Sequence, residues 1–107
     1  MVEYGVNNME LQRELKTAIG SGELLFGQNQ TIDACDRGQA KLVILAANCP
    51  QTWIDDLHAR HPDVAKHRVG IVNRELGTAC AKPFSISVIC VVEAGSSDLL
   101  TLRSNID

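Results

Sequence analysis

The sequence predicts a single α/β domain in which helices cover both faces of a small mixed sheet, a three-layer α/β/α sandwich. The strongest indication is residues 42–47, LVILAA, an apolar run too short to cross a bilayer and too continuous for a half-exposed strand. Such a strand must be covered on both faces, which requires helices above and below the sheet. Residues 85–92, SISVICVV, end fully apolar, as a second buried strand would. A chain of 107 residues can bury one core of this kind, so we expect one domain over residues 1–107.

Composition and charge narrow the class of protein. Neither the start of the chain nor any later run is apolar over the length of a signal peptide or a membrane span, so we expect a soluble intracellular protein. The net charge is −3, but residues 37–82 carry seven basic and four acidic side chains, a net +3. This modest excess fits a phosphate-binding patch about as well as an ordinary solvated surface.

The chain before residue 41 predicts a helix, a short strand and a second helix. Residues 9–19 have apolar side chains at the spacing of one helix face, namely Leu11, Leu15, Ala18 and Ile19. Residues 24–26 form a brief strand that stops at Gly27, and a second helix follows over residues 28–37.

The chain after the central strand predicts two further helices and a third strand. Thr52 and Asp55 have the spacing of a capping box, which starts a third helix that runs to about His61. Residues 69–72 are the best candidate for the third strand, and residues 73–82 form the fourth helix.

The end of the chain predicts one short helix. After the buried strand of residues 85–92, Ser96 caps a helix over residues 98–102. The termini, at about residues 1–8 and 103–107, are polar and are expected to fray.

The cysteines favour packing over chemistry. Free cysteine packs as a small hydrophobe, so we interpret the four as reduced, buried thiols. The competing interpretation is a small thiol enzyme that uses Cys49 or Cys80, with the pKa of Cys80 lowered by a nearby helix start. The cysteines are Cys35, Cys49, Cys80 and Cys90.

The histidines give no metal signature. His58 and His61 could ligate a metal with Asp55 or His67, but solvent-facing histidines are favoured because no fourth ligand is in place. The sequence therefore predicts no catalytic residue, no cofactor and no metal site.

Three stretches of the chain carry a family resemblance: GQAKLVILAANCP from Gly38, NRELGTACAK from Asn73 and EAGSSDLL from Glu93. In this order and spacing they resemble the kink-turn RNA-binding family of ribosomal proteins over residues 22–102, its eukaryotic large-subunit members in particular. The resemblance implies an α/β/α sandwich that binds ribosomal RNA at a sharply bent, internally looped helix. It also implies a non-catalytic structural component of the large ribosomal subunit, in the cytoplasm after assembly in the nucleus or nucleolus.

The resemblance implies partners as well. These are large-subunit ribosomal RNA and neighbouring ribosomal proteins, with no membrane, no small-molecule substrate, and a protein that is monomeric when free. Within the same fold, the alternative is a related kink-turn-binding protein of a small nucleolar or spliceosomal ribonucleoprotein.

The candidate RNA contacts fall at two loop-to-helix junctions and in the turn after the central strand. Bent RNA exposes base edges, which short polar side chains read while helix amides hold phosphates. Gly77 would let a backbone or a base approach closely, and Arg74 and Lys82 are the nearest cations for phosphate. By the resemblance, Phe84 stacks on RNA. The two helix starts should then lie side by side. The candidates are Gly27, Asn29, Gln30, Thr31, Asn48, Asn73, Arg74, Glu75, Leu76, Gly77, Thr78, Lys82 and Phe84.

The candidates also have structural interpretations. Asn29 could cap a helix, Leu76 could be a core residue, and Phe84 could pack beneath the following strand. Glu75 would repel phosphate, so its expected role is to brace the loop. The chain departs from the family because Asn29 and Asp33 stand where relatives carry lysines, and because it is acidic overall. Fewer phosphate contacts should weaken its affinity for isolated RNA.

Overall fold

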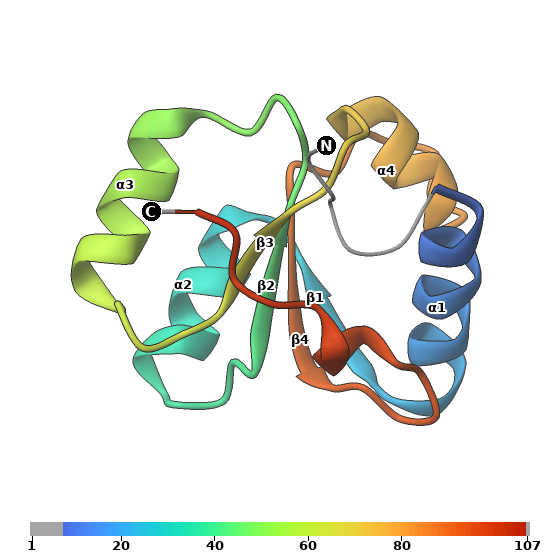
Figure 1. The fold of residues 1–107 in the computed structure, drawn as a ribbon, viewed down its shortest axis with the longest axis horizontal. Helices are drawn as coiled ribbons and strands as arrows, with labels where there is room; N and C mark the ends of the chain where they lie inside the picture. Colours follow the sequence, from blue (N-terminus) through green and yellow to red (C-terminus); the bar gives the residue numbers. More distant parts are fainter. Residues whose placement is uncertain (1–7, 107) are drawn as a thin grey trace.

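A four-stranded mixed sheet stands between two layers of helices in the computed structural model, which describes residues 8–106 (Figure 1). The elements are α1 (Asn8–Ser21), β1 (Glu23–Phe26), α2 (Gln28–Asp36), β2 (Leu42–Leu45), α3 (Gln51–Arg60), β3 (Lys66–Arg68), α4 (Asn73–Ala79), β4 (Val88–Glu93) and the 3₁₀ helix η1 (Leu99–Thr101). α1 and α4 cover one face of the sheet, and α2 and α3 cover the other. The predicted three-layer α/β/α sandwich is confirmed.

The two interior strands are those that the sequence marks as buried. The strand order is β1-β4-β2-β3, which places β2 and β4 inside the sheet. Leu42 and Ile44 pack in the core beneath α1 and α4, whereas Val43 and Leu45 pack in the core beneath α2 and α3. All four side chains of β2 are at most 1% exposed, so the strand is covered on both faces.

The strand directions bring three helix starts to one end of the sheet, where β1, β2 and β3 finish. β1 and β2 both pair antiparallel with β4, and β3 runs parallel to β2. The carboxyl ends of β1, β2 and β3 therefore lie at the same end of the sheet, the upper end in Figure 1. Because α2, α3 and α4 each follow one of these strands, all three helices begin there.

The third strand lies earlier than residues 69–72, at Lys66–Arg68. Its sequence, KHR, gives no apolar signal, yet Lys66 and His67 are buried and pair in parallel with β2. The prediction is wrong because only pairing with a neighbouring strand reveals this segment.

The start of α3 also differs from the prediction. The helix begins at Gln51 with Pro50 at the N-cap position, so Thr52 lies inside the first turn and caps nothing. Gln51 instead pairs with Asp55, at 2.9 Å from Nε2 to Oδ1.

α4 ends at Ala79 and not at residue 82, because Ala81 turns the chain with a φ of 59°. The turn brings Phe84 back against Gly77, where a Cβ would overlap the Phe84 carbonyl oxygen. Lys82 N–H also donates to Gly77 O at 2.9 Å. Gly77 is therefore required by the protein's own backbone.

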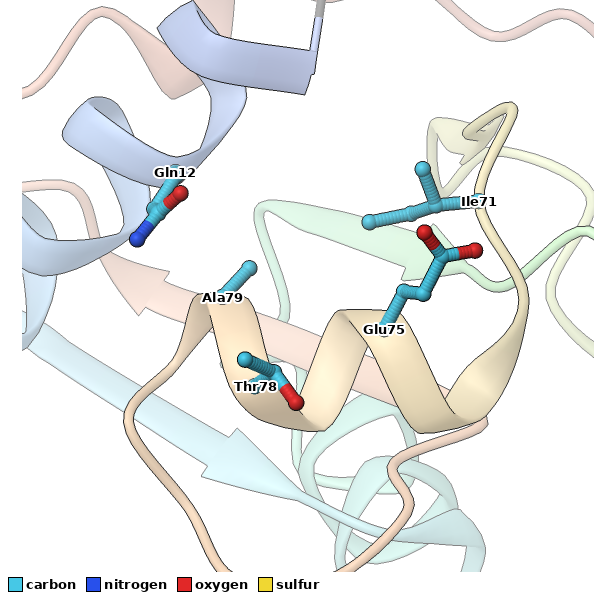
Figure 2. Close-up of a pocket in the computed structure, with 5 residues that line it drawn as sticks. All are labelled: Gln12, Ile71, Glu75, Thr78 and Ala79. Carbon is cyan, nitrogen blue, oxygen red and sulfur yellow. The ribbon is translucent and has the colours of Figure 1, made fainter.

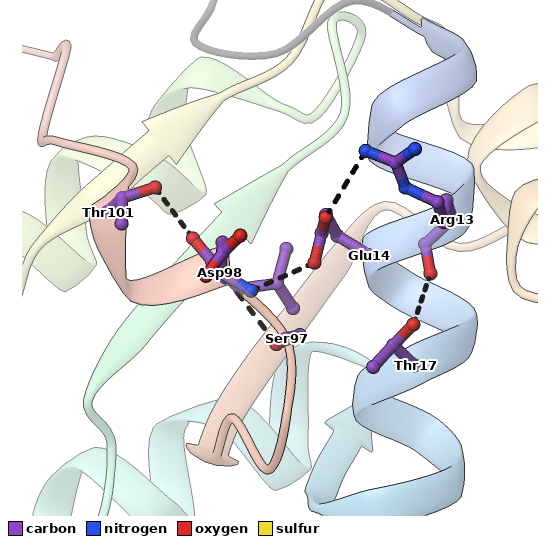
Figure 3. Close-up of polar contacts among 7 residues, drawn as sticks. Arg13, Glu14, Thr17, Ser97, Asp98 and Thr101 are labelled. Carbon is purple, nitrogen blue, oxygen red and sulfur yellow. Dashed lines mark hydrogen bonds and ion pairs between the residues drawn. The ribbon is translucent and has the colours of Figure 1, made fainter.

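The short last helix, η1, is docked on α1 and is not capped by Ser96. Asp98 N–H donates to Glu14 Oε1 at 2.8 Å (Figure 3). Thr101 Oγ1 donates to Asp98 O at 2.6 Å. Leu99 then packs into the core beneath α1. The residue before η1 is thus held by a carboxylate of α1.

The described part of the tail is held in place. Residues 103–106, which were expected to fray, lie against β3 and form hydrogen bonds with it. Residues 1–7 and 107, also expected to fray, lie outside the described residues, and residue 8 begins α1. Within residues 8–106, no helix combines the length and the hydrophobicity needed to cross a membrane.

Gly77→Ala is expected to lower the free energy of unfolding by about 1 to 3 kcal/mol, because the added methyl group must displace the backbone at Phe84. Chemical denaturation followed by circular dichroism measures this change. Gly20→Ala is the matched control: a Cβ at Gly20, in α1, meets nothing within 4 Å. The control should be neutral or stabilising by up to about 1 kcal/mol. Equal effects of the two changes would contradict the crowding at Gly77.

Candidate nucleic-acid interface

The starts of α2 and α4 hold the same stretch of chain, at and just before the start of β4. At the start of α2, Gly27 N–H donates to Val88 O at 3.0 Å and so continues the pairing of β1 with β4. At the start of α4, Asn73 O accepts from Ile86 N–H at 2.9 Å, and Asn73 Nδ2 donates to Ser87 Oγ at 3.4 Å. The two helix starts thus lie on either side of the upper end of the sheet (Figure 1), close together as expected from the sequence.

The start of α2 presents Asn29 and Gln30 to solvent. Gly27 precedes the helix with φ 108° and ψ 160°, a conformation essentially restricted to glycine. Thr31 is 0% exposed, and its hydroxyl donates to Gly27 O at 2.7 Å. Gly27 and Thr31 therefore shape this junction, whereas Asn29 and Gln30 are open to a ligand.

The start of α4 is capped from the loop after β2. Asn48 Oδ1 accepts from Asn73 N–H at 2.8 Å, and Asn48 Nδ2 donates to Asn73 Oδ1 at 3.2 Å. This pair satisfies the first backbone amide of α4, for which Val72 at the N-cap position offers no side-chain bond. Asn48 is exposed, so the paired amides face solvent.

Leu76 and Gly77 are closed to a ligand. Leu76 is 0% exposed and belongs to the core beneath α1 and α4. Gly77 is buried against the backbone of Phe84. Leu76 is thus a core residue, the structural interpretation that the sequence left open, and the close approach that Gly77 permits is made by the backbone of the chain itself.

A surface hollow of about 240 Å³ lies beside the turn that follows α4. Phe84 is 56% exposed there, which rules out packing of its ring beneath β4. Arg74 is also exposed, and its guanidinium has no hydrogen bond or ion pair with any residue in 8–106. An aromatic face and an unpaired cation are thus presented together. The hollow is lined by Arg74, Thr78, Lys82, Pro83, Phe84 and Ser85.

Lys82 connects this hollow to the other junction. Its Nζ lies 5.0 Å from the centroid of the Phe26 ring, a cation–π distance. Phe26 ends β1 and directly precedes Gly27. The contact therefore holds a positive charge between the Phe84 hollow and the start of α2.

Glu75 lies on the side of α4 that faces α1. It lines a second hollow, of about 220 Å³, to which Gln12 contributes from α1 (Figure 2). Its carboxylate lies beside Ile71 in Figure 2. Thr78 lines both hollows, so α4 separates the Glu75 carboxylate from the Phe84 hollow. Glu75 is positioned to brace the contact of α1 with α4.

The two thiols considered as nucleophiles, Cys49 and Cys80, are both buried. Burial raises the pKa of Cys80 to about 11. Cys80 follows the carboxyl end of α4, so no helix start lowers its pKa. Burial raises the pKa of the Cys49 thiol as well.

The histidines and acidic residues form no metal site in the described part of the chain, since no three ligating side chains gather within residues 8–106. His61 is not simply solvent-facing, because its Nε2 lies 2.7 Å from Asp36 Oδ1 and ties α3 to α2.

Sequence reasoning misses Pro83 and Ser85, which line the hollow on either side of Phe84. An aromatic residue between proline and serine is a turn signal that could have identified them. The pairing of Asn48 with Asn73 is also missed, because 25 positions separate them in the chain.

Comparison with known proteins gives consistent matches over most of the chain. A family model described as the ribosomal protein L7Ae/L30e/S12e/Gadd45 family matches residues 9–101. Large ribosomal subunit protein eL30 of Methanosphaerula palustris is 38% identical over 95 residues, which cover 89% of this chain and 98% of that protein. The eL30 protein of Methanospirillum hungatei is 39% identical over 94 residues, covering 88% of this chain and 98% of that protein.

A solved structure, described as a protein with unknown function from Bacillus halodurans, matches with a TM-score of 0.71 at 28% identity. The match covers 89% of this chain and 95% of that one. Sequence and fold agree, and the chain belongs to the ribosomal protein L7Ae/L30e/S12e/Gadd45 family.

Proposed function

We propose that this protein is a non-catalytic structural component of the large ribosomal subunit that binds ribosomal RNA at a kink-turn or a similar bent internal-loop element. Its family, and its similarity to proteins named large ribosomal subunit protein eL30, support the proposal. The observation that carries it is the exposed ring of Phe84 beside Arg74, whose guanidinium has no partner among residues 8–106, next to the starts of α2 and α4.

The exposed side chains supply three kinds of contact. Arg74 and Lys82 carry positive charges that suit phosphate. Phe84 offers a ring face on which an unstacked base can lie. Asn29 and Gln30 carry amides that can both donate to and accept from base edges. These contacts match what a bent RNA offers and a regular duplex hides.

The remaining candidates act more indirectly. Asn48 and Asn73, which pair at the start of α4, and Thr78, which lines the Phe84 hollow, make secondary contacts. The other candidates support the surface without touching RNA, and they are Gly27, Thr31, Glu75, Leu76 and Gly77.

Shape contributes more than charge to this interaction. The chain has a net charge of −3, and the proposed surface carries two cations, Arg74 and Lys82. Because each neutralised phosphate adds to the salt dependence of binding, few contacts mean a shallow dependence on salt. Discrimination of a bent RNA from a straight duplex then rests on stacking and base-edge contacts.

The proposal includes place and partners. The protein would act in cytoplasmic ribosomes, with large-subunit RNA and neighbouring ribosomal proteins as partners, and would be a monomer when free. Assembly in the nucleus or nucleolus stays a prediction. Co-sedimentation with mature large subunits separates this role from a small nucleolar or spliceosomal one, which no observation here favours.

Phe84→Ala is expected to weaken binding to a kink-turn RNA by about 1 to 3 kcal/mol, because a stacked base loses its aromatic partner. Fluorescence anisotropy with a labelled kink-turn RNA measures the change. Leu100→Ala is the matched control, since Leu100 is 49% exposed on η1, away from the proposed surface. Wild-type affinity in Phe84→Ala would contradict stacking.

Arg74→Gln should weaken binding and lower the slope of log affinity against log salt by about 1, because one phosphate contact is lost. The same anisotropy titration at several salt concentrations gives the slope. Arg37→Gln is the control: Arg37 lies at the opposite end of α2 and pairs with Asp33. A slope that falls equally in both variants would argue against a phosphate at Arg74.

A thiol enzyme is the alternative from another class, and the buried thiols argue against it. Because the pKa of Cys80 is raised to about 11 and that of Cys49 is also raised, neither is a thiolate at neutral pH. Native protein should therefore react slowly with iodoacetamide at both residues, and urea-unfolded protein rapidly. Mass spectrometry of the labelled peptides provides the measurement. Rapid labelling of either cysteine in native protein would instead support thiol chemistry.

A further inference from the structure

The sheet has two edge strands, β1 and β3, and each faces the same physical problem. An edge strand presents unpaired N–H and C=O groups that can pair with a strand of another chain. β1 is interrupted by an irregularity between Glu23 and Leu24, which blunts it. β3 has no bulge and is closed differently.

Two residues of the tail satisfy all the outward backbone groups of β3. Lys66 and Arg68 direct these groups away from β2, because residues alternate in direction along a strand. Lys66 N–H donates to Ser104 Oγ at 3.4 Å, and Lys66 O accepts from Asn105 N–H at 3.0 Å. Arg68 N–H donates to Asn105 Oδ1 at 2.7 Å, and Arg68 O accepts from Asn105 Nδ2 at 2.9 Å.

The Asn105 side chain therefore acts as a peptide group. Its amide offers one acceptor and one donor to Arg68, as a neighbouring strand would. An amide cannot extend the sheet further, because no main chain continues beyond it in that direction. The tail thus ends the hydrogen-bond ladder instead of creating a new edge.

The tail is also fixed at both of its ends. Leu102 is buried in the core beneath α1 and α4, whereas Ile106 packs against the core beneath α2 and α3. Between them, His67 Nδ1 donates to Arg103 O at 2.8 Å. The segment therefore passes around the edge of the sheet from one core to the other (Figure 1).

β3 carries a second deterrent to pairing. Lys66 is 0% exposed, and its ammonium donates to His61 O at 2.6 Å and to Val64 O at 2.7 Å. An inward-pointing charge of this kind makes an edge strand a poor template for addition of another strand. Two independent features thus protect the same edge.

We propose that residues 103–106 form a strap that closes the β3 edge against a second copy of this chain, and that Asn105 holds the strap in place. The strap keeps the free protein monomeric. It lies along β3, outside the proposed RNA surface, so RNA affinity is not its readout and the two proposals can fail separately.

Asn105→Ala tests the strap at the level of one amide. Hydrogen exchange followed by NMR should show Arg68 N–H exchanging about fivefold to tenfold faster, since a hydrogen bond contributes about 1 kcal/mol. Asn105→Asp keeps the acceptor for this amide and should stay near wild type. Arg103→Ala is the control, because Arg103 contributes its main-chain carbonyl and not its side chain. Wild-type exchange at Arg68 in Asn105→Ala would overturn the assignment of Asn105.

Self-association tests the purpose of the strap. Sedimentation from micromolar to millimolar concentration should show a monomer for wild type and Arg103→Ala, and concentration-dependent dimers for Asn105→Ala and for a chain ending at Leu102. If the shortened chain does not fold, Asn105→Ala decides alone. A monomer at every concentration in the folded variants would overturn the proposal.

Discussion

The coverage of β2 and β4 on both faces is the constraint on which the rest of the structure depends. Both strands carry apolar side chains at successive positions, and burying each large one is worth roughly 1.5 to 3 kcal/mol. Neither face can be left open, so a short chain must return across the sheet after β1, β2 and β3 and build two helical layers. Each helix starts where the preceding strand ends, so the starts of α2, α3 and α4 lie together at one end of the sheet. The candidate interface is thus a consequence of burial.

At that end of the sheet, packing decides which side chains stay exposed to solvent and available to a ligand. Thr31 and Leu76 turn inward, one to fix the Gly27 turn and the other to fill the core. Gly77 lets the chain fold back on α4, and this approach holds the turn that leaves Phe84 exposed. The buried residues Thr31, Leu76 and Gly77 therefore shape the surface at the helix starts, and the exposed Phe84 is available for binding.

Polar groups are treated differently at two places on the sheet: the end where the helices start, and the edge strand β3. The side chains of Asn29 and Gln30 at the start of α2 are exposed where a partner is expected, whereas the outward backbone groups of β3 are bonded by the tail. The ammonium of the buried Lys66 donates to two backbone carbonyls that follow α3, those of His61 and Val64. Burial lowers the pKa of this lysine, so these hydrogen bonds offset part of the cost of burying its charge.

The sequence by itself determined the fold class, both interior strands and the approximate positions of the four main helices. Its apolar runs and helical spacing are local patterns, and local patterns survive without knowledge of the partner. It could not locate β3, because the residues KHR become a strand only when β2 pairs with them. It also could not reveal the capping of α4 by Asn48 or the hydrogen bonds between Asn105 and Arg68. It also could not tell that Leu76 is buried and Phe84 exposed, since exposure depends on what the rest of the chain covers. Tertiary structure decided these points because each is a contact between residues far apart in the chain, and spacing along the sequence carries no record of it.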